Sequence, residues 1–180
     1  DQERIAALHA AAHAAGVMPL ATGDVLYATP ENRMLQDVMT FAGSVATGDL
    51  TSVIEVRSAS AYGQGNVTFT NGFTNTGLIE LRTLDAAYGN RLAVTNGTLV
   101  NAPGAIIRAV PGFGSKELAA QLDNQGTLDV DEALTLNRAS SAHLNSGLID
   151  LSTANLTVTQ AGTTPSFTNT GTIATNGRTV

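Results

Sequence analysis

Three acidic residues recur at the same place in a repeated pattern, and they are the side chains of this sequence best suited to acid–base chemistry. Glu80, Asp129 and Asp150 each stand in the middle of an apolar–variable–apolar triplet. Two carboxyl groups roughly 5–9 Å apart can act as acid and base on a glycosidic bond. Neighbouring rungs of a stacked sheet give separations in that range. The three residues are therefore the catalytic candidates if the protein is a polysaccharide lyase or hydrolase.

A water-facing row is the simpler interpretation of these positions, and we prefer it. The middle residue of a strand triplet points outward when its neighbours point inward. Arg108, which takes the same place in another triplet, would relieve repulsion between the carboxylates beside it. A divalent cation bridging Asp129 and Asp150 is a further alternative. We expect no catalytic residues, no metal and no cofactor.

The triplets belong to a repeat that begins at about residue 50. Five segments have the form Asn, one or two residues, Gly, then the triplet. The asparagines are Asn75, Asn101, Asn124, Asn145 and Asn169, and the turn glycines are Gly77, Gly104, Gly126, Gly147 and Gly171. These glycines lie 27, 22, 21 and 24 residues apart. Such a period suits one turn of a solenoid with three short strands.

Two further columns follow the same period. A second strand in each coil is predicted from Val67-Thr68-Phe69, Leu92-Ala93-Val94, Leu134-Thr135-Leu136 and Leu156-Thr157-Val158. A third strand leads into each asparagine through Phe73, Leu99, Leu122, His143 and Phe167. Thr70-Asn71-Gly72 and Thr95-Asn96-Gly97 predict turns between the second and third strands. The coil at 105–123 is irregular, because Pro111, Gly112 and Gly114 interrupt its second strand.

The repeat predicts a mainly β fold, a parallel β-helix (β-solenoid) of about five to six coils over residues 47–180. Stacking at about 4.8 Å places one apolar residue of each coil in a single interior file: Ile79, Ile107, Leu128, Ile149 and Ile173. The aligned asparagines should form a ladder at one corner, in which each side-chain amide bonds to the next rung.

Residues 1–46 are predicted to form a short helical N-terminal cap on the first coil. An alanine-rich stretch favours a helix at about 2–15. Thr29, Pro30 and Glu31 are a helix start signal, which predicts a second helix at about 30–42. His9 and His13 are four residues apart on the first helix, and we interpret both as surface residues.

Composition excludes several classes of function. The net charge is −6 and the basic residues are scattered, which argues against nucleic acid or an anionic membrane as partner. The chain has no Cys, so disulfides and thiolate metal sites are excluded. No apolar stretch is long enough to cross a membrane. Aromatic residues are only 4% of the chain, which disfavours an aromatic-lined sugar groove.

One outward column and one inward residue are further candidates for function. Thr68, Ala93, Thr135 and Thr157 are predicted to form an outward column on the second strand. Flat threonine arrays can bind ice, but the strand propensity of Thr explains this column adequately. His143 falls at an inward position, and we expect a partly buried, hydrogen-bonded side chain.

The repeats resemble those of a known group of bacterial proteins. Asn75–Leu81, Asn124–Val130 and Asn145–Leu151 share the style Asn-x-Gly-x-Ile-x-Leu. It resembles the repeats of filamentous-haemagglutinin-type exoproteins and related autotransporter passengers, over about residues 50–178. The resemblance implies a bacterial protein that is secreted or exposed at the cell surface, often as an adhesin.

Three hypotheses for function follow, in order of preference. The first is an extracellular structural or adhesive module that displays a surface or builds a filament or stalk. The second is a carbohydrate-active β-helix that uses the acidic column, and the third is an ice-binding solenoid. Candidate partners are a surface glycan, a host protein, or further coils or another copy at the C-terminal edge. We expect that edge to be covered, because the chain stops one strand into a coil at Val180.

Overall fold

The computed structural model describes residues 52–85 and 87–180 in full and the backbone of residues 38–41. All of these belong to one compact unit, Met34–Val180. This part of the chain forms strands and contains no helix. The strands make two sheets, and every pairing between neighbouring strands is parallel.

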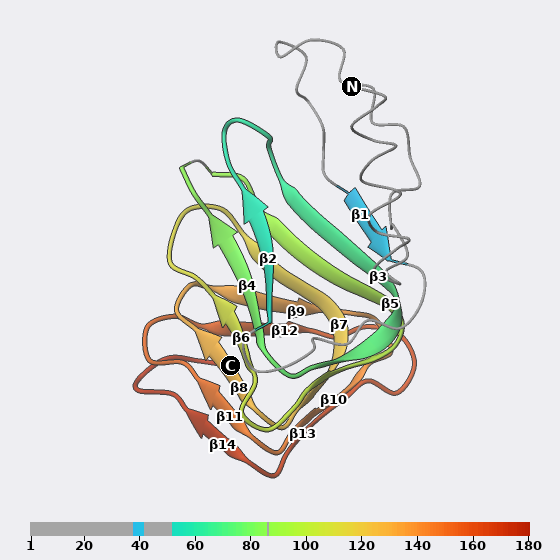
Figure 1. The fold of residues 1–180 in the computed structure, drawn as a ribbon. Coiled ribbons are helices and arrows are strands. Elements are labelled where there is room, and N and C mark those ends of the chain that lie inside the picture. Colours follow the sequence, from blue (N-terminus) through green and yellow to red (C-terminus); the bar gives the residue numbers. More distant parts are fainter. Residues whose placement is uncertain (1–37, 42–51, 86) are drawn as a thin grey trace. The chain divides into compact units, whose positions relative to one another are not determined.

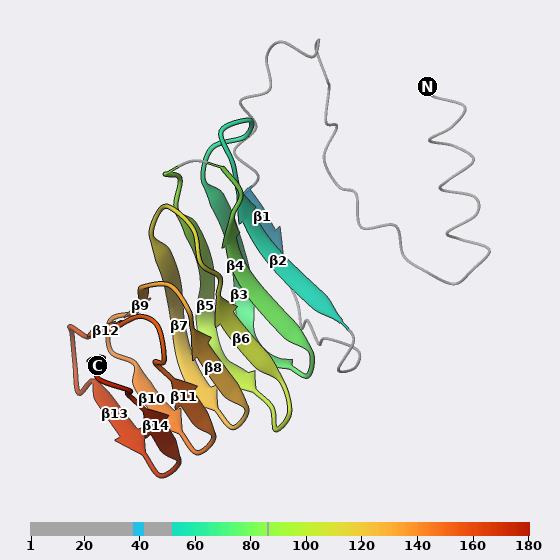
Figure 2. The same ribbon diagram turned by 90° about the vertical axis from the view of Figure 1, so that its left-hand side faces the viewer.

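The two sheets are the walls of a β-solenoid of about five turns, which confirms the predicted parallel β-helix but not its helical cap (Figure 1). Sheet A contains β1 (Val38–Phe41), β3 (Gly65–Asn75), β5 (Asn90–Asn101), β7 (Lys116–Asn124), β9 (Leu134–Asn137), β10 (Ala142–Asn145), β12 (Leu156–Thr159) and β13 (Ser166–Asn169). Sheet B contains β2 (Val53–Ser58), β4 (Leu78–Thr83), β6 (Ile106–Ala109), β8 (Thr127–Val130), β11 (Leu148–Asp150) and β14 (Thr172–Ala174). Figure 2 shows the strands of successive coils stacked side by side.

Sheet B has the register that the repeat predicts. The first apolar residues of the triplets are direct partners from strand to strand, in the order Ile54, Ile79, Ile107, Leu128, Ile149, Ile173. The residues two positions later, from Val56 to Leu151, also point inward and are buried. Both ends of each triplet therefore face the interior, as the two-residue period of a strand requires.

The core lies between the two sheets as one continuous apolar cluster. Leu92, Leu99 and Leu118 of sheet A meet the isoleucine file of sheet B, and each has no exposed surface. Burying one such side chain contributes roughly 1.5–3 kcal/mol. At the first coils, Phe69 and Phe73 pack with ring centroids 4.3 Å apart. The repeated coils thus share a core that no single coil could form.

The predicted asparagine ladder is present at one corner of the solenoid. The side-chain amide of each asparagine donates to the side-chain oxygen of the next: Asn75 to Asn101 (2.8 Å), Asn101 to Asn124 (2.8 Å), Asn124 to Asn145 (2.7 Å) and Asn145 to Asn169 (2.6 Å). The first four side chains are buried. The same amides also donate to backbone carbonyls, such as that of Leu148 from Asn124 (2.9 Å). We call this region the asparagine corner.

Glycine is required at the asparagine corner because successive turns approach one another closely. A Cβ atom on Gly147 would lie 2.1 Å from the carbonyl oxygen of Gly126, and one on Gly171 would lie 2.2 Å from that of Gly147. Gly104 has a different reason, because its φ of 83° lies in the left-handed region. The turn glycines were expected from their spacing, and close approach explains most of them better than backbone conformation.

The first coils are simpler than the predicted three-strand turn. β3, β5 and β7 each run continuously through what were expected to be a second and a third strand. The predicted turns at Thr70-Asn71-Gly72 and Thr95-Asn96-Gly97 are wrong, because both segments lie inside strands and produce irregularities of register. Gly72 stays in the strand because its backbone packs directly on Thr98. Only in the last two coils is the sheet A side divided into two strands, β9 and β10 and then β12 and β13.

The coil at 105–123 is also more regular than expected. Gly112 and Gly114 lie in the loop that precedes β7, so they do not interrupt a strand. The place of the second strand is taken by Leu118-Ala119-Ala120, and Leu118 pairs with Leu92. The sequence pattern did not predict this strand, because it required a large apolar residue at both ends of the triplet and Ala120 is small.

The helix predicted at about 30–42 is wrong at its end, because Val38–Phe41 form the strand β1. β1 pairs in parallel with β3, and Phe41 is the partner of Phe69. A short apolar run fits either a helix or a strand by its period, and here pairing with a neighbouring strand prevailed. The rest of the predicted cap, including the helix at 2–15 with His9 and His13, lies outside the described residues.

Candidate functional site

The acidic candidates lie on the outer face of sheet B in the predicted column. The residues in direct register are Glu55, Glu80, Arg108, Asp129, Asp150 and Ala174. Asp129 and Asp150 are direct partners on adjacent strands, about 4.8 Å apart along the stack. Glu80 is separated from them by the rung of Arg108. The structure therefore brings two of the three candidates together.

Arginines of the same face bind most of these carboxylates. Arg82 contacts Glu80 at 2.9 Å and Glu55 at 3.0 Å, and Arg57 also pairs with Glu55. The signs of charge therefore alternate along each of the first two strands, and Arg82 lies close enough to bind the glutamates of both. Glu80 is mostly shielded, with 11% of its side chain exposed. The oxygens of these carboxylates are thus engaged by guanidinium groups of the same face.

Arg108 makes the corresponding pair in the middle of the column. Its guanidinium contacts Asp129 at 2.7 Å and Asp131 at 3.6 Å. The hydrogen bond to Asp129 raises the pKa of Arg108, although partial burial opposes this. Asp150 has a local partner instead, because it accepts a hydrogen bond of 3.0 Å from the backbone N–H of Ser152. The column is thus a row of ion pairs that ends in a turn-capping aspartate.

The predicted threonine column does not exist as one row. Thr68 pairs with Ala93, which pairs with Ala119. Thr135 instead pairs with Glu117 and with Thr157. The register on sheet A differs by two residues from the one that the sequence pattern suggested. The threonines consequently fall in two separate files, and the flat array that ice binding would need is not formed by these four positions.

His143 is buried and hydrogen-bonded, more completely than expected. Its Nδ1 accepts a hydrogen bond of 3.2 Å from the backbone N–H of Leu122, and its Nε2 lies 2.9 Å from the Ser141 hydroxyl. Because Nδ1 is an acceptor, the neutral ring carries its proton on Nε2 and donates it to Ser141. Burial lowers the pKa of His143, and Arg138 lowers it further. The ring cannot accept a proton from Ser141, so the pair is structural.

A buried polar cluster at the opposite end of sheet B was missed by the sequence reasoning. We call it the lysine cluster, and it consists of Ser58, Thr83, Asn90 and Lys116. The Ser58 hydroxyl donates to Thr83 (3.0 Å), and the Thr83 hydroxyl lies 2.9 Å from the side-chain oxygen of Asn90. Asn90 and Lys116 are direct partners on β5 and β7. The four side chains therefore form one network across three coils.

Lys116 is the least expected member of this cluster, with only 1% of its surface exposed. Its ammonium donates to the Thr83 hydroxyl (2.6 Å) and to the carbonyl of Phe113 (2.9 Å). Burial lowers the pKa of Lys116, and the charge of Glu132 opposes that shift. Asn90-x-Leu92 and Lys116-x-Leu118 share an inward position two residues before the strand leucine, and this alignment could have revealed the cluster. In the structure the amine fastens the Phe113 loop to the neighbouring coil.

A shallow depression of about 420 Å³ lies on sheet A, over the bulges of β3 and β5. It is lined by residues 71–74, residues 96–98 and Val100. Arg138 reaches the same bulge from a later coil and donates to the carbonyls of Thr95 (2.8 Å) and Gly97 (2.7 Å). The lining offers amides and hydroxyls but no charged side chain, and it brings no acid–base pair together.

Groups of candidate metal ligands and membrane-spanning helices are both absent from the described residues. Among residues 52–85 and 87–180, no group of three or more His, Asp or Glu side chains could hold a metal ion. The described part of the chain also has no helix with the length and apolarity of a membrane span.

In comparisons with known proteins, no family model, no curated protein and no solved structure matches this chain.

Proposed function

We propose that this chain is an extracellular structural or adhesive β-solenoid module that displays a surface or builds a filament or stalk, without catalysis. The observation that carries this proposal is the paired state of the acidic column. Glu55, Glu80 and Asp129, which could have served as acid and base, are bound by arginines of the same face. Two of these ion pairs, Arg82–Glu55 and Arg108–Asp129, join neighbouring rungs, which suits a rigid scaffold.

The internal bonding of the solenoid supports the same role. Every coil is joined to the next by strand pairing, by the asparagine ladder and by a shared apolar core. These contacts repeat along the axis, so each added coil extends the same structure and its surface. A rigid stack of this kind suits a display platform or a spacer. The secreted or cell-surface location rests on the resemblance of the repeats to bacterial exoproteins.

A carbohydrate-active enzyme is the second candidate, and one observation favours it. Asp129 and Asp150 are adjacent rungs of one face, and Asp150 makes no ion pair with any described residue. Two carboxyl groups at that spacing could act on a glycosidic bond. Against this, Arg108 already holds Asp129 in a hydrogen bond.

The two candidates are separated by a search for cleavage. The protein is incubated with a panel of acidic and neutral polysaccharides, and new reducing ends and new unsaturated ends are measured. We expect none above the background of the Asp129→Asn and Asp150→Asn variants. Cleavage that both substitutions abolish, but that Glu117→Gln on sheet A leaves intact, would establish the enzyme and overturn the proposal.

A further inference from the structure

The junction between β7 and β10 on sheet A is held by fewer strand pairs than the junction that follows it. β10 pairs with β13 along all four of its residues, but with β7 only at its last two. Two side chains bridge the strands where this pairing stops. The side-chain oxygen of Gln121 accepts from the backbone N–H of Ala142 (3.1 Å), and Nδ1 of His143 accepts from that of Leu122 (3.2 Å). We call these four residues the histidine seam.

One of the two bridges depends on the protonation state of His143. In the neutral ring Nδ1 accepts from Leu122, while Nε2 carries the proton and donates it to the Ser141 hydroxyl. An imidazolium donates from both nitrogens. Its Nδ1–H would point at the N–H of Leu122, so two buried donors would meet and both would lack an acceptor. Protonation therefore removes one bond and leaves buried groups unsatisfied.

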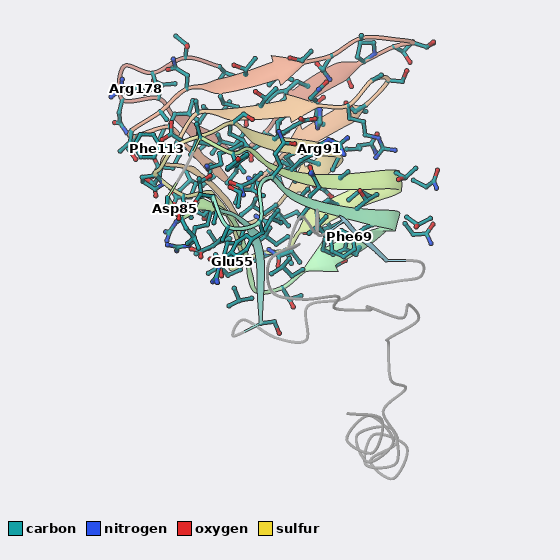
Figure 3. The ribbon with its side chains drawn as sticks, turned by 90° about the horizontal axis from the view of Figure 1, so that it is seen from above. Glu55, Phe69, Asp85, Arg91, Phe113 and Arg178 are labelled. Atoms are coloured by element: carbon teal, nitrogen blue, oxygen red, sulfur yellow. The ribbon has the colours of Figure 1, made fainter. Side chains whose placement is uncertain are left out.

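The position of the ring adds to the cost of a positive charge. Only 2% of His143 is exposed, whereas charged side chains such as those of Glu55 and Asp85 lie toward the outside of the solenoid (Figure 3). Burial lowers the pKa of His143, and the like charge of Arg138, in the loop before β10, lowers it further. The ring is thus held in its neutral form by its surroundings.

Charged side chains on the strands packed around His143 do not compensate for an imidazolium. On β7, Asp123 stands on the outward side of the strand, and Lys116 and Glu117 lie at its other end. β9, β12 and β13 contain no titratable residue. Across the core, Asp129 and Asp150 belong to the outer face of sheet B. Among the described residues, the charge that acts on the ring is therefore that of the arginine in the preceding loop.

We propose that the histidine seam is a pH-sensitive switch, in which protonation of His143 opens the junction between β7 and β10. The opening is local, because it breaks the bond from Leu122 while sheet B keeps its own pairing between β8 and β11. Titration of histidine near physiological pH is a general basis of acid sensing. The inference is independent of the proposed function, and it gives the stack a joint that responds to acid.

The direction of the switch follows from the two states of the seam. In the open seam the ring meets water and has its ordinary pKa of 6.5, whereas the closed seam holds the pKa of His143 below that value. Protons therefore bind the open state first. The closed state is fully favoured above about pH 6.5, and below it the opening equilibrium rises by up to about tenfold per pH unit until the closed-state pKa is reached.

Hydrogen–deuterium exchange of the full chain, followed by NMR, measures this opening residue by residue. Protection is recorded from about pH 7.5 to 5 and corrected for the intrinsic pH dependence of amide exchange. We expect the protection of the Leu122 amide to fall by up to about tenfold per pH unit below about pH 6.5. The Ile106 amide, which donates to the carbonyl of Gly77 in earlier coils (2.9 Å), is the internal control and should keep its protection.

Two variants assign the effect to the ring. His143→Asn places a side-chain oxygen where Nδ1 stands, so it can accept from Leu122 without titrating, and the acid dependence at Leu122 should disappear. Arg138→Gln keeps the histidine and removes the like charge that lowers its pKa. In that variant the loss of protection should level off at a higher pH than in the parent. Because it retains His143, this second variant serves even if the first fails to fold.

Three results would overturn the inference. One is an equal loss of protection at Leu122 and at Ile106, which would mean that acid loosens the whole solenoid. Another is the same acid dependence in the parent and in His143→Asn. The third is an imidazole ¹⁵N spectrum that places the proton of neutral His143 on Nδ1, because the ring could then not accept from Leu122.

Discussion

The two corners of sheet B satisfy the hydrogen bonds of their buried polar side chains in different ways. The strands of sheet B from β4 on follow the asparagine corner. In the first three coils the strands of sheet B end at the loops 59–64, 84–89 (residue 86 aside) and 110–115, which we call the loop corner and which lie next to the lysine cluster. Both corners bury polar side chains inside an apolar solenoid. One of them uses the same residue on every rung, whereas the other uses Ser58, Thr83, Asn90 and Lys116 once each.

The difference follows from the hydrogen-bonding capacity of the side chains. An asparagine amide donates on one side and accepts on the other, so identical residues can satisfy each other along an unlimited stack. A lysine ammonium only donates, so lysines cannot repeat in this way, and the lysine cluster is a closed network of different side chains. The loops beside it carry exposed aromatic side chains. The asparagine corner therefore keeps the register, and the loop corner varies in sequence from coil to coil.

The largest expected effect is the removal of a central rung of the ladder. Asn124→Ala removes one acceptor of the Asn101 amide (2.8 Å) and the donor to the Asn145 side-chain oxygen (2.7 Å) and to the Leu148 carbonyl (2.9 Å). Unsatisfied buried groups cost about 1–3 kcal/mol each, so we expect a loss of about 3 kcal/mol of unfolding free energy, measured by urea denaturation. Asn169→Ala, at the exposed end of the ladder, should cost less than half as much. Equal effects would show that the ladder is not what stabilises the corner.

Acidification should weaken the coils next to the asparagine corner. The pKa of His143 is lowered by burial from its ordinary value of 6.5. The unfolded state therefore takes up this proton first, and stability is complete above about pH 6.5 and falls as the pH drops toward the folded-state pKa. The pH dependence of urea unfolding should be flatter for His143→Gln than for the parent between pH 7 and 5. Parallel curves would contradict the buried, neutral ring.

A smaller effect is expected in the lysine cluster. Lys116→Met keeps the apolar stem and removes the buried charge, while Thr83 retains its bonds to Asn90 and to the carbonyl of Tyr88. Replacing a buried charge by an apolar group of similar volume is often neutral or stabilising. We expect a change in unfolding free energy within about 1 kcal/mol. A loss as large as that of Asn124→Ala would mean that both corners are essential to the scaffold.

The smallest effect should come from the outer face. Asp129→Asn removes the ion pair with Arg108, which keeps its contact with Asp131. Partly exposed pairs of this kind contribute about 0–1 kcal/mol, so thermal unfolding should change little, and less in high salt. Loss of folding would show that the column faces the interior and that the assignment of faces is inverted.

The sequence by itself determined what repeats. The triplet register of sheet B, the isoleucine file and the asparagine ladder were all predictable, because identical residues at a constant period satisfy one another when coils are stacked. The two-residue period of a strand and the hydrogen-bonding capacity of an amide are local properties, and stacking repeats them from coil to coil.

The tertiary structure decided what occurs only once. The split of the threonine column, the place of Lys116 and the strand at Val38–Phe41 depend on how each coil pairs with its neighbour. A shift of two residues in one coil is invisible in a two-residue period, yet it changes which residues of β7 and β9 are partners. The exposed aromatic residues have the same origin, because the loops between sheet B and sheet A bring Tyr62, Tyr88 and Phe113 to one edge although aromatic residues are rare in the chain.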